Sequence, residues 1–581
     1  MGIDLGLGTR GIFMCGIVGI VGTRPVAPLI VDALKRLEYR GYDSAGVATI
    51  EGDHLDRRRA EGKLVNLEEH LKDDPLGGEI GIGHTRWATH GAPVKINAHP
   101  HFSSNVAVVH NGIIENFREL REELEGDGFV FSSQTDTEVI AHLVAQGLKR
   151  GLKPQEAAHA AIKRLRGAFA LAVMFGDQPD LIIGARQGPP LAVGHGDGEM
   201  YLGSDAVALA PFTNEITYLE DGDWATINRA GAQIFDMEGN TVDRQQQISS
   251  GSAMMVDKGN HRHFMVKEIY EQPEVIGHTL SHYLSFNDEC IALPEAASVD
   301  FNAIDRISIT ACGTAYLAGL VSKYWFERLA RLPTDIDIAS EFRYREAPLS
   351  EQGLSLFISQ SGETADTLAG LKYCEAAGQH LAAIVNVRES TIARSCHSVF
   401  PTLAGPEIGV ASTKAFTCQL AVLASLAVTA GVQRGHINAA QENKLVQALS
   451  EAPRYANEAL HLEEQIAALA HKLANKKSVL YLGRDTNFPL ALEGALKLKE
   501  LSYIHAEGYA AGELKHGPIA LVDEEMPVVV VAPYDRIFEK TVSNMQEVAA
   551  RGGKIILITD PRGAAEVGMD EAELIIMPEM P

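Results

Sequence analysis

The second half of the chain repeats one local pattern, in which a short apolar strand is followed by a polar, glycine-containing loop and then by a helix. Strands of this kind are predicted at residues 306–310, 354–359, 479–482, 528–531 and 555–558. Strands that alternate with helices favour a parallel sheet with helices on both faces. We therefore predict two α/β domains with doubly wound parallel sheets, at residues 290–435 and 465–581, joined by a helical segment at residues 436–464.

The first part of the chain lacks this regular alternation. Strands are predicted at residues 16–21, 106–110 and 168–175, and helices at residues 25–37, 117–125 and 137–148. This mixture predicts an α+β domain of layered antiparallel sheets and helices at residues 15–235. The chain then becomes polar from Gln245 to Gly259, which predicts a linker inside a connecting segment at residues 236–289.

Composition narrows the class of protein. A chain of 581 residues is too long for one hydrophobic core. Its net charge of −25 repels a phosphate backbone and argues against nucleic acid as a partner. The six cysteines have no spacing typical of a zinc site or a disulfide framework, which fits a reducing cytoplasm. The longest apolar stretch, Leu420 to Val432, is shorter than the roughly 20 residues that a membrane span needs.

Cys15 stands directly behind Met14 and opens an apolar strand. If translation begins at Met14 and this methionine is removed, Cys15 becomes the first residue. The α-amine of a first residue, with a pKa near ~8, can act as the general base for its own thiol. This arrangement is typical of an N-terminal-nucleophile hydrolase. The alternative is a small buried cysteine at the start of a core strand.

Four further clusters carry side chains suited to catalysis. They are Arg40–Ser44, Thr85–Gly91, His110–Gly112 and Gln134–Glu138. Each has a simpler explanation when taken alone: an Asn-Gly pair usually forms a turn, Asp136 could cap a helix, and Arg86 could be a solvated surface charge. The five histidines between residues 84 and 110 raise the possibility of a metal site, but no HExxH or Cys/His pairing accompanies them, and we predict none.

Taken together with Cys15, these clusters resemble the class II glutamine amidotransferases over residues 14 to 235. The resemblance implies an N-terminal-nucleophile (Ntn) hydrolase fold in which Cys15 attacks the side-chain amide of glutamine. It also implies that the Asn111 side chain and the Gly112 N–H stabilise the oxyanion. The implied glutamine-binding residues are Arg86, Thr89, His90 and Asp136, with Trp87 as an ammonia gate.

The segment Ser359-Gln360-Ser361-Gly362-Glu363-Thr364 lies between a predicted buried strand and a helix. Hydroxyls, backbone N–H groups and the helix N-terminus converge there, as in many phosphate sites, although a well-capped helix would look the same. The segment resembles the phosphosugar loop of sugar isomerase (SIS) domains. Together with segments 263–273, 312–314, 409–416 and 513–518, it resembles the glucosamine-6-phosphate synthase family, the isomerising glutamine:fructose-6-phosphate aminotransferases.

Glu493, Lys497 and Glu500 are spaced so that a helix places them on one face, as in a solvated ion-pair stripe. The resemblance instead implies catalytic roles for Glu500, Lys497 and His516: Glu500 moves a proton between C1 and C2 of the sugar, and His516 assists ring opening in the neighbouring subunit's site. The implied sugar-phosphate-binding residues are Thr314, Ser359, Gln360, Ser361, Thr364, Ser412 and Glu493. No cofactor is implied.

The resemblance implies that L-glutamine and D-fructose 6-phosphate give L-glutamate and D-glucosamine 6-phosphate, the first step of hexosamine synthesis, in a cytoplasmic homodimer formed through the SIS domains. Two departures stand out. We expect residues 1–14 to be absent from the mature chain, because they block the α-amine of Cys15. The family continues past residue 581 to a tail with an imine-forming lysine, so we expect little synthase activity from this form.

Alternatives remain. One is a glutaminase or a sugar-phosphate-binding protein without synthase activity, which the two departures would explain. Another is an amidotransferase with a different acceptor, such as an amidophosphoribosyltransferase or an asparagine synthetase. The Ser359–Thr364 loop and the absence of a nucleotide-binding motif count against that alternative.

Overall fold

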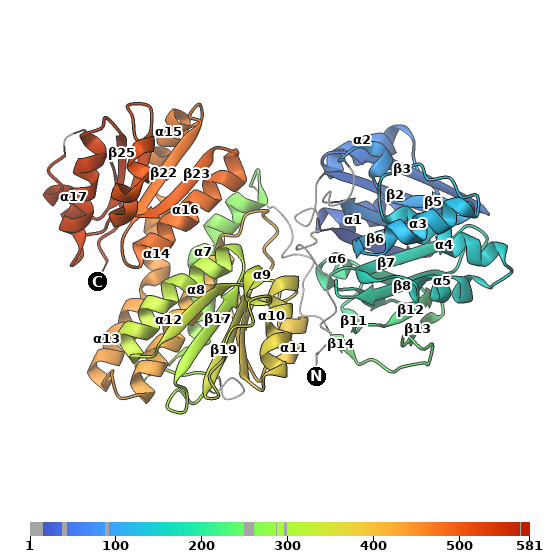
Figure 1. The fold of residues 1–581 in the computed structure, drawn as a ribbon, viewed down its shortest axis with the longest axis horizontal. Helices are drawn as coiled ribbons and strands as arrows, with labels where there is room; N and C mark the ends of the chain where they lie inside the picture. Colours follow the sequence, from blue (N-terminus) through green and yellow to red (C-terminus); the bar gives the residue numbers. More distant parts are fainter. Residues whose placement is uncertain are drawn as a thin grey trace. The chain divides into compact units, whose positions relative to one another are not determined.

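The computed structural model describes residues 15–37, 43–86, 92–248, 261–285, 288–294, 299–569 and 571–580. The chain divides into two units, Met1–Asp257 and Lys258–Pro581, coloured blue to green and green to red in Figure 1. Each unit has its own sheets and its own hydrophobic cores.

The first unit contains two antiparallel sheets. Within the described residues, the larger sheet has the strand order β14-β11-β9-β10-β1-β4-β2-β3, and the smaller has the order β13-β12-β8-β7-β6-β5. The larger sheet is made of β1 (Gly16–Val21), β2 (Ser44–Glu51), β3 (His54–Glu61), β4 (Ile80–Arg86), β9 (Ala192–His195), β10 (Met200–Gly203), β11 (Glu215–Tyr218) and β14 (Gln246–Ile248). The smaller is made of β5 (His101–Ser103), β6 (Val106–Ile114), β7 (Gly167–Phe175), β8 (Ile182–Gln187), β12 (Trp224–Asn228) and β13 (Gly231–Phe235).

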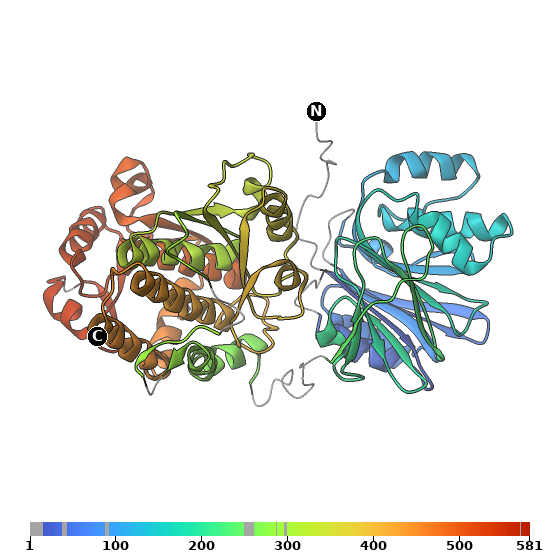
Figure 2. The same ribbon diagram turned by 90° about the horizontal axis from the view of Figure 1, so that it is seen from below.

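Helices cover the outer faces of this pair of sheets, as Figure 2 shows from the edge. They are α1 (Ala27–Lys35), α2 (Leu64–Asp73), α3 (Phe117–Gly126), α4 (Thr137–Lys149), α5 (Pro154–Ile162) and α6 (Ala206–Leu209). The two-residue period of a strand explains the layers, because alternate residues point to opposite faces. Ile17 of β1 packs between the sheets, whereas Val18 packs against α1. This is the layered α+β arrangement that the sequence predicts.

The second unit contains two parallel sheets with the same order of strands. The first has the order β18-β17-β19-β20-β21 and the second the order β23-β22-β24-β25-β26. Their strands are β17 (Arg306–Ala311), β18 (Thr334–Ile338), β19 (Gly353–Ser359), β20 (His380–Val385), β21 (Ser398–Pro401), β22 (Ser478–Gly483), β23 (His505–Ala510), β24 (Pro527–Val531), β25 (Lys554–Thr559) and β26 (Glu573–Ile576). The shared order is that of a repeated doubly wound unit, as the sequence predicts.

Helices flank both parallel sheets (Figure 1). They are α7 (Phe264–Ser281), α8 (Gly313–Trp325), α9 (Ala339–Phe342), α10 (Ala365–Ala376), α11 (Thr391–Ser395), α12 (Lys414–Gln433), α13 (Ala439–Ser450), α14 (Ala452–Leu460), α15 (Glu463–Leu473), α16 (Asn487–Ser502), α17 (Phe538–Ala549) and α18 (Pro561–Glu566). Among the described residues, α12 alone has the length and composition of a membrane span, but most of it is buried. Its residues Val422, Leu423 and Leu426 pack in the core of the first parallel sheet.

One local prediction is wrong. The Asn111-Gly112 pair does not end its strand, because β6 continues to Ile114 and Gly112 pairs with Phe169 of β7. Gly112 has a φ of +127°, and a Cβ atom there would lie 2.0 Å from the Ala168 carbonyl oxygen, so glycine is required inside the strand. The start of the polar stretch predicted as a linker, Gln245 to Gly259, contributes the edge strand β14, and residues 249–259 of that stretch lie outside the described part of the chain.

Candidate active sites

Cys15 immediately precedes β1 and is buried, with 6% of its surface exposed. Gly16 pairs with Thr85 of β4, so Cys15 lies beside the end of β4, where Arg86 stands. Burial lowers the pKa of the Arg86 guanidinium, and its electrostatic interactions with Cys15, Asp136 and Asp43 oppose this shift. The nucleophile candidate and two carboxylates therefore lie near one buried cation.

Asn111 lies on β6 of the smaller sheet, and Asp136 lies at the start of α4. Asn111 Nδ2 donates a hydrogen bond to the carbonyl oxygen of Cys15 at 2.9 Å. Asp136 stands at the N-cap position of α4, but its side chain makes no capping bond there and instead accepts from the backbone N–H of Ile114 at 2.8 Å. Capping therefore does not explain Asp136. The structure brings Cys15, Arg86, Asn111 and Asp136 into one neighbourhood.

Other predicted residues of this site lie outside the described part of the chain. They are Met14, Arg40, Gly41, Tyr42, Trp87, Thr89 and His90. Sequence reasoning missed two polar neighbours of Asn111, namely His84 and Ser204. The alternation along β4 could have indicated His84, since residues two apart on a strand share a face and Arg86 was already singled out.

The second cluster joins α16 to the first turn of α8. Lys497 Nζ lies 2.6 Å from Glu500 Oε2 and 3.5 Å from Glu493 Oε1, and it donates to Thr314 Oγ1 at 3.0 Å. Thr314 in turn donates to Glu493 at 3.1 Å. Burial raises the pKa of Glu493, and the charge of Lys497 opposes this shift. Glu493 is only 7% exposed and Lys497 is half-buried, whereas Glu500 is exposed, so the cluster extends from the interior to the surface and is not a fully solvated stripe.

The Ser359–Thr364 loop follows β19 at the carboxyl edge of the first parallel sheet. Ser359 Oγ lies 2.9 Å from Thr364 Oγ1 and accepts from the Gly362 N–H at 3.0 Å. Thr364 precedes α10 without making a side-chain cap bond. The loop is adjacent to the Thr314 segment, because β17 and β19 are neighbouring parallel strands. The strand order reverses between these two strands, which is the position where doubly wound sheets bind ligands.

Comparisons with known proteins agree with this division. The glutamine amidotransferase domain family matches residues 84–211, and the SIS domain family matches residues 301–429 and 472–578. The glutamine–fructose-6-phosphate aminotransferase (isomerizing) of Mesorhizobium japonicum is 72% identical over 98% of this chain and 93% of its own length. The corresponding protein of Bradyrhizobium diazoefficiens is 66% identical over 98% of this chain and 93% of its own length. The chain belongs to this aminotransferase family.

A solved structure resembles the second part of this aminotransferase. It is the C-terminal domain of glucosamine-fructose-6-phosphate aminotransferase from Francisella tularensis, which is 42% identical and has a TM-score of 0.54. The match covers 56% of this chain and 92% of that one. The predicted fold class, an amidotransferase domain followed by two SIS domains, is confirmed by these comparisons.

In this aminotransferase, two buried carboxylates hold the loop that carries Ser412. Glu407 accepts from Ser412 Oγ at 2.9 Å and from the backbone N–H groups of Thr413 and Ala415. Glu268 of α7 accepts from the backbone N–H groups of Ile408 and Gly409. Burial, helped by the charge of Glu407, raises the pKa of Glu268 to about 7, although the two N–H donors and Lys414 favour its ionised form.

Replacing Glu268 with glutamine is expected to flatten the pH dependence of stability. The folded pKa of about 7 exceeds the ordinary value of 4.5, so folding favours the protonated carboxyl. This contribution to stability is fully present below pH ~4.5 and is lost as the pH rises through about 7. Its size is on the order of 3 kcal/mol, since the folded pKa exceeds the ordinary one by more than two units and each unit corresponds to about 1.4 kcal/mol. Urea unfolding midpoints at several pH values measure it.

The matched control for this prediction is Glu274→Gln on the same helix, because the side chain of Glu274 is 72% exposed. We expect this variant to keep the pH dependence of the unchanged chain. If Glu268→Gln also kept it in full, Glu268 would not be the group responsible.

His516 makes no described hydrogen bond or ion pair with the α16 cluster. It is exposed at the end of the 3-10 helix Ala511–His516. Gln360 and Ser361 lie in the loop after β19, where Ser361 Oγ accepts from the Glu363 N–H at 3.2 Å. Among the described residues, no group of three histidine, cysteine or acidic side chains is arranged to hold a metal ion.

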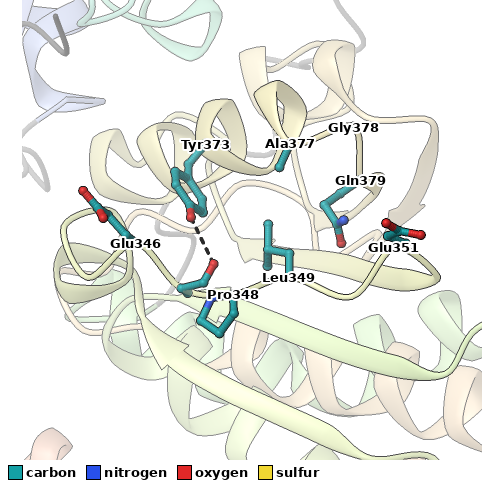
Figure 3. A pocket seen from close by; sticks show the side chains of 9 residues that line it. Glu346, Pro348, Leu349, Glu351, Tyr373, Ala377, Gly378 and Gln379 are labelled. Atoms are coloured by element: carbon teal, nitrogen blue, oxygen red, sulfur yellow. Dashed lines mark hydrogen bonds between the residues drawn. The ribbon is translucent and has the colours of Figure 1, made fainter. Parts of the chain in front are cut away.

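A pocket of about 400 Å³ lies elsewhere on the first parallel sheet. Figure 3 shows the residues that line this pocket, among them Glu346, Leu349 and Tyr373. The Tyr373 hydroxyl donates a hydrogen bond to the backbone carbonyl oxygen of Ala347. Within this lining, Glu351 lies two residues before β19 and Gln379 lies directly before β20. The pocket is therefore at the amino edge of the sheet, opposite the Ser359–Thr364 loop.

Proposed function

We propose that the chain converts L-glutamine and D-fructose 6-phosphate into L-glutamate and D-glucosamine 6-phosphate. The observation that carries this proposal is the presence, in one chain of this family, of two separate clusters with the required chemistry. One places a cysteine near a buried arginine, an asparagine amide and an aspartate. The other places a lysine between two carboxylates beside a phosphate-type loop.

In the first half-reaction, the Cys15 thiol attacks the side-chain amide carbon of glutamine, with the α-amine of Cys15 accepting the proton. The oxyanion that forms is stabilised by the Asn111 amide and the Gly112 N–H. Collapse of this intermediate breaks the C–N bond and releases ammonia, which takes up the proton. Water then hydrolyses the thioester to glutamate. This step requires that Cys15 carry a free α-amine, so we propose that the active form begins at Cys15.

Arg86 and Asp136 bind the amino-acid end of glutamine in this proposal. The guanidinium group of Arg86 can donate hydrogen bonds to both oxygens of the α-carboxylate, and Asp136 pairs with the ammonium group. Trp87, Thr89 and His90 complete the glutamine pocket and its ammonia gate.

Arg86→Lys is expected to raise the KM for glutamine by about 10- to 100-fold with a smaller change in kcat. A lysine cannot make the two parallel bonds of a guanidinium, and a hydrogen bond to a charged group contributes about 1.5–3 kcal/mol. Steady-state glutaminase kinetics measure the change. The matched control is Arg229→Lys, a partly exposed residue of the same unit that pairs with Glu79 and Asp180. An unchanged KM in Arg86→Lys would contradict the assignment.

In the second half-reaction, ammonia adds to C2 of the open-chain ketose, and loss of water gives an imine. Glu500 then takes a proton from C1 and returns it to C2, which yields the 2-amino-2-deoxyaldose. Lys497 positions Glu500 and Glu493, and His516 of a neighbouring subunit assists ring opening. The phosphate is held by Thr314, Ser359, Gln360, Ser361 and Thr364, while Ser412 binds a sugar hydroxyl.

We further propose a cytoplasmic homodimer formed through the SIS domains. The proposed domains are residues 15–235, 290–435 and 465–581, with connecting segments at residues 236–289 and 436–464. Sedimentation equilibrium measures the oligomeric state, and a monomer at micromolar concentration would contradict this part.

The proposal is tested by incubating the chain with both substrates and measuring glutamate and hexosamine phosphate together. The chain processed to begin at Cys15 is assayed beside the full 581-residue chain. We expect equal amounts of the two products from the processed form, in place of the low synthase activity expected from the sequence alone, because the similarity to aminotransferases over nearly the whole chain favours the complete reaction. Glutamate without amino sugar would indicate a glutaminase, and neither product would indicate a sugar-phosphate-binding protein.

A further inference from the structure

The side-chain amide of Asn111 is held from two sides. Its Oδ1 atom lies 2.9 Å from His84 Nε2, while Nδ2 donates to the Cys15 carbonyl at 2.9 Å and to Ser204 Oγ at 3.0 Å. A backbone carbonyl oxygen can only accept, so the nitrogen of the amide must face Cys15. The oxygen of the amide must therefore face His84.

The contacts of His84 also define its tautomer. His84 Nε2 lies 3.1 Å from the carbonyl oxygen of His110 in addition to Asn111 Oδ1, and both of these atoms accept. Nε2 must therefore carry the hydrogen. Within the described residues, His84 Nδ1 has no hydrogen-bond partner. His84 is 0% exposed, and burial, with the charges of Arg86 and His110, lowers its pKa to about 3. The ring is thus neutral and donates from Nε2 throughout the working pH range.

The surroundings of the ring keep this donor in place. The rings of His84 and His99 lie 4.2 Å apart between centroids. His99 Nε2 is in turn bonded to Thr137 Oγ1 at 2.7 Å, at the first residue of α4. A close-packed ring that is backed by an anchored neighbour has little freedom to swing away from Asn111.

We propose that His84 is a positioning residue for glutamine hydrolysis, because it holds the Asn111 amide with Nδ2 toward the nucleophile residue. The inference rests on the proposed function, in which Asn111 donates to the oxyanion. Without the His84 donor, Asn111 Oδ1 is buried without a partner, and only the contacts of Nδ2 with the Cys15 carbonyl and Ser204 still hold the amide. An amide held from one side only is less firmly placed, so its N–H stabilises the oxyanion less well.

The first test compares three histidine variants in the glutaminase assay. His84→Leu is expected to lower kcat by about 10- to 100-fold, somewhat less than the 10²- to 10³-fold typical of deleting an oxyanion donor. The KM for glutamine should stay within about twofold, because Arg86 and Asp136 bind the other end of the substrate. His84→Gln retains an N–H donor and should recover most of kcat. The control is His142→Leu, since buried His142 bonds Ser103 and does not touch Asn111.

The second test is a double-mutant cycle with Asn111→Ala. If His84 acts through Asn111, the double variant should be no slower than Asn111→Ala alone. If the two losses multiply, His84 acts independently and the inference is overturned. An unchanged kcat in Asn111→Ala itself would instead remove the proposed role of Asn111, and the inference with it, so the two failures are distinguishable.

Discussion

Cys15→Ala is expected to reduce glutamine hydrolysis by about 10⁴-fold or more, because removing the nucleophile of a covalent mechanism removes the catalytic unit as a whole. The ammonia readout of the glutaminase assay measures this loss. The change deletes one sulfur atom at a buried position and leaves the contacts of the backbone carbonyl with Asn111 in place. We therefore expect the variant to keep its fold and its glutamine binding.

The matched controls for Cys15 are two other buried cysteines, Cys374 and Cys418, which lie in the cores of the second unit. Burial raises the pKa of both thiols, which keeps them protonated and unreactive. Their alanine variants should hydrolyse glutamine at nearly the original rate. A Cys15→Ala variant with a substantial fraction of that rate would contradict the role of Cys15 as nucleophile.

Glu500→Gln is expected to lower amino sugar formation by about 10²- to 10⁴-fold, the usual contribution of a general base. The amide cannot accept the C1 proton, whereas Lys497 keeps its contacts with Glu493 and Thr314. Glutamine hydrolysis should remain within about twofold, because the residues of that site lie in the other unit. Loss of deuterium from C1 of labelled fructose 6-phosphate measures the proton transfer directly.

Lys499→Gln is the control for Glu500, because Lys499 is the exposed neighbour of Glu500 on α16. It should leave both activities unchanged. If Glu500→Gln exchanged deuterium at the original rate, another group would have to move the proton.

Local sequence patterns predicted the layers of the fold and the faces of its elements. The alternation of Ile17 and Val18 follows from the two-residue period of a strand, and the shared face of Glu493, Lys497 and Glu500 follows from helical spacing. These features depend on neighbours along the chain, so the sequence is sufficient for them.

Contacts between segments that are far apart in the sequence could not be predicted from local patterns. Asn111 and Ser204 are 93 residues apart, and Lys497 and Thr314 are 183 residues apart, so neither contact follows from spacing. Local patterns also failed to predict that β6 continues through Asn111 and Gly112. The pairing of β6 with β7 overrides the usual turn preference of an Asn-Gly pair, because Gly112 can adopt the positive φ that this pairing requires.

Glutamine labelled with nitrogen-15 at its amide tests the central claim most directly. The processed chain is incubated with labelled glutamine and fructose 6-phosphate, and the products are analysed by mass spectrometry. The account predicts that each glucosamine 6-phosphate carries one labelled nitrogen and that the glutamate carries none. Labelled ammonium released into solution with no labelled amino sugar would contradict it.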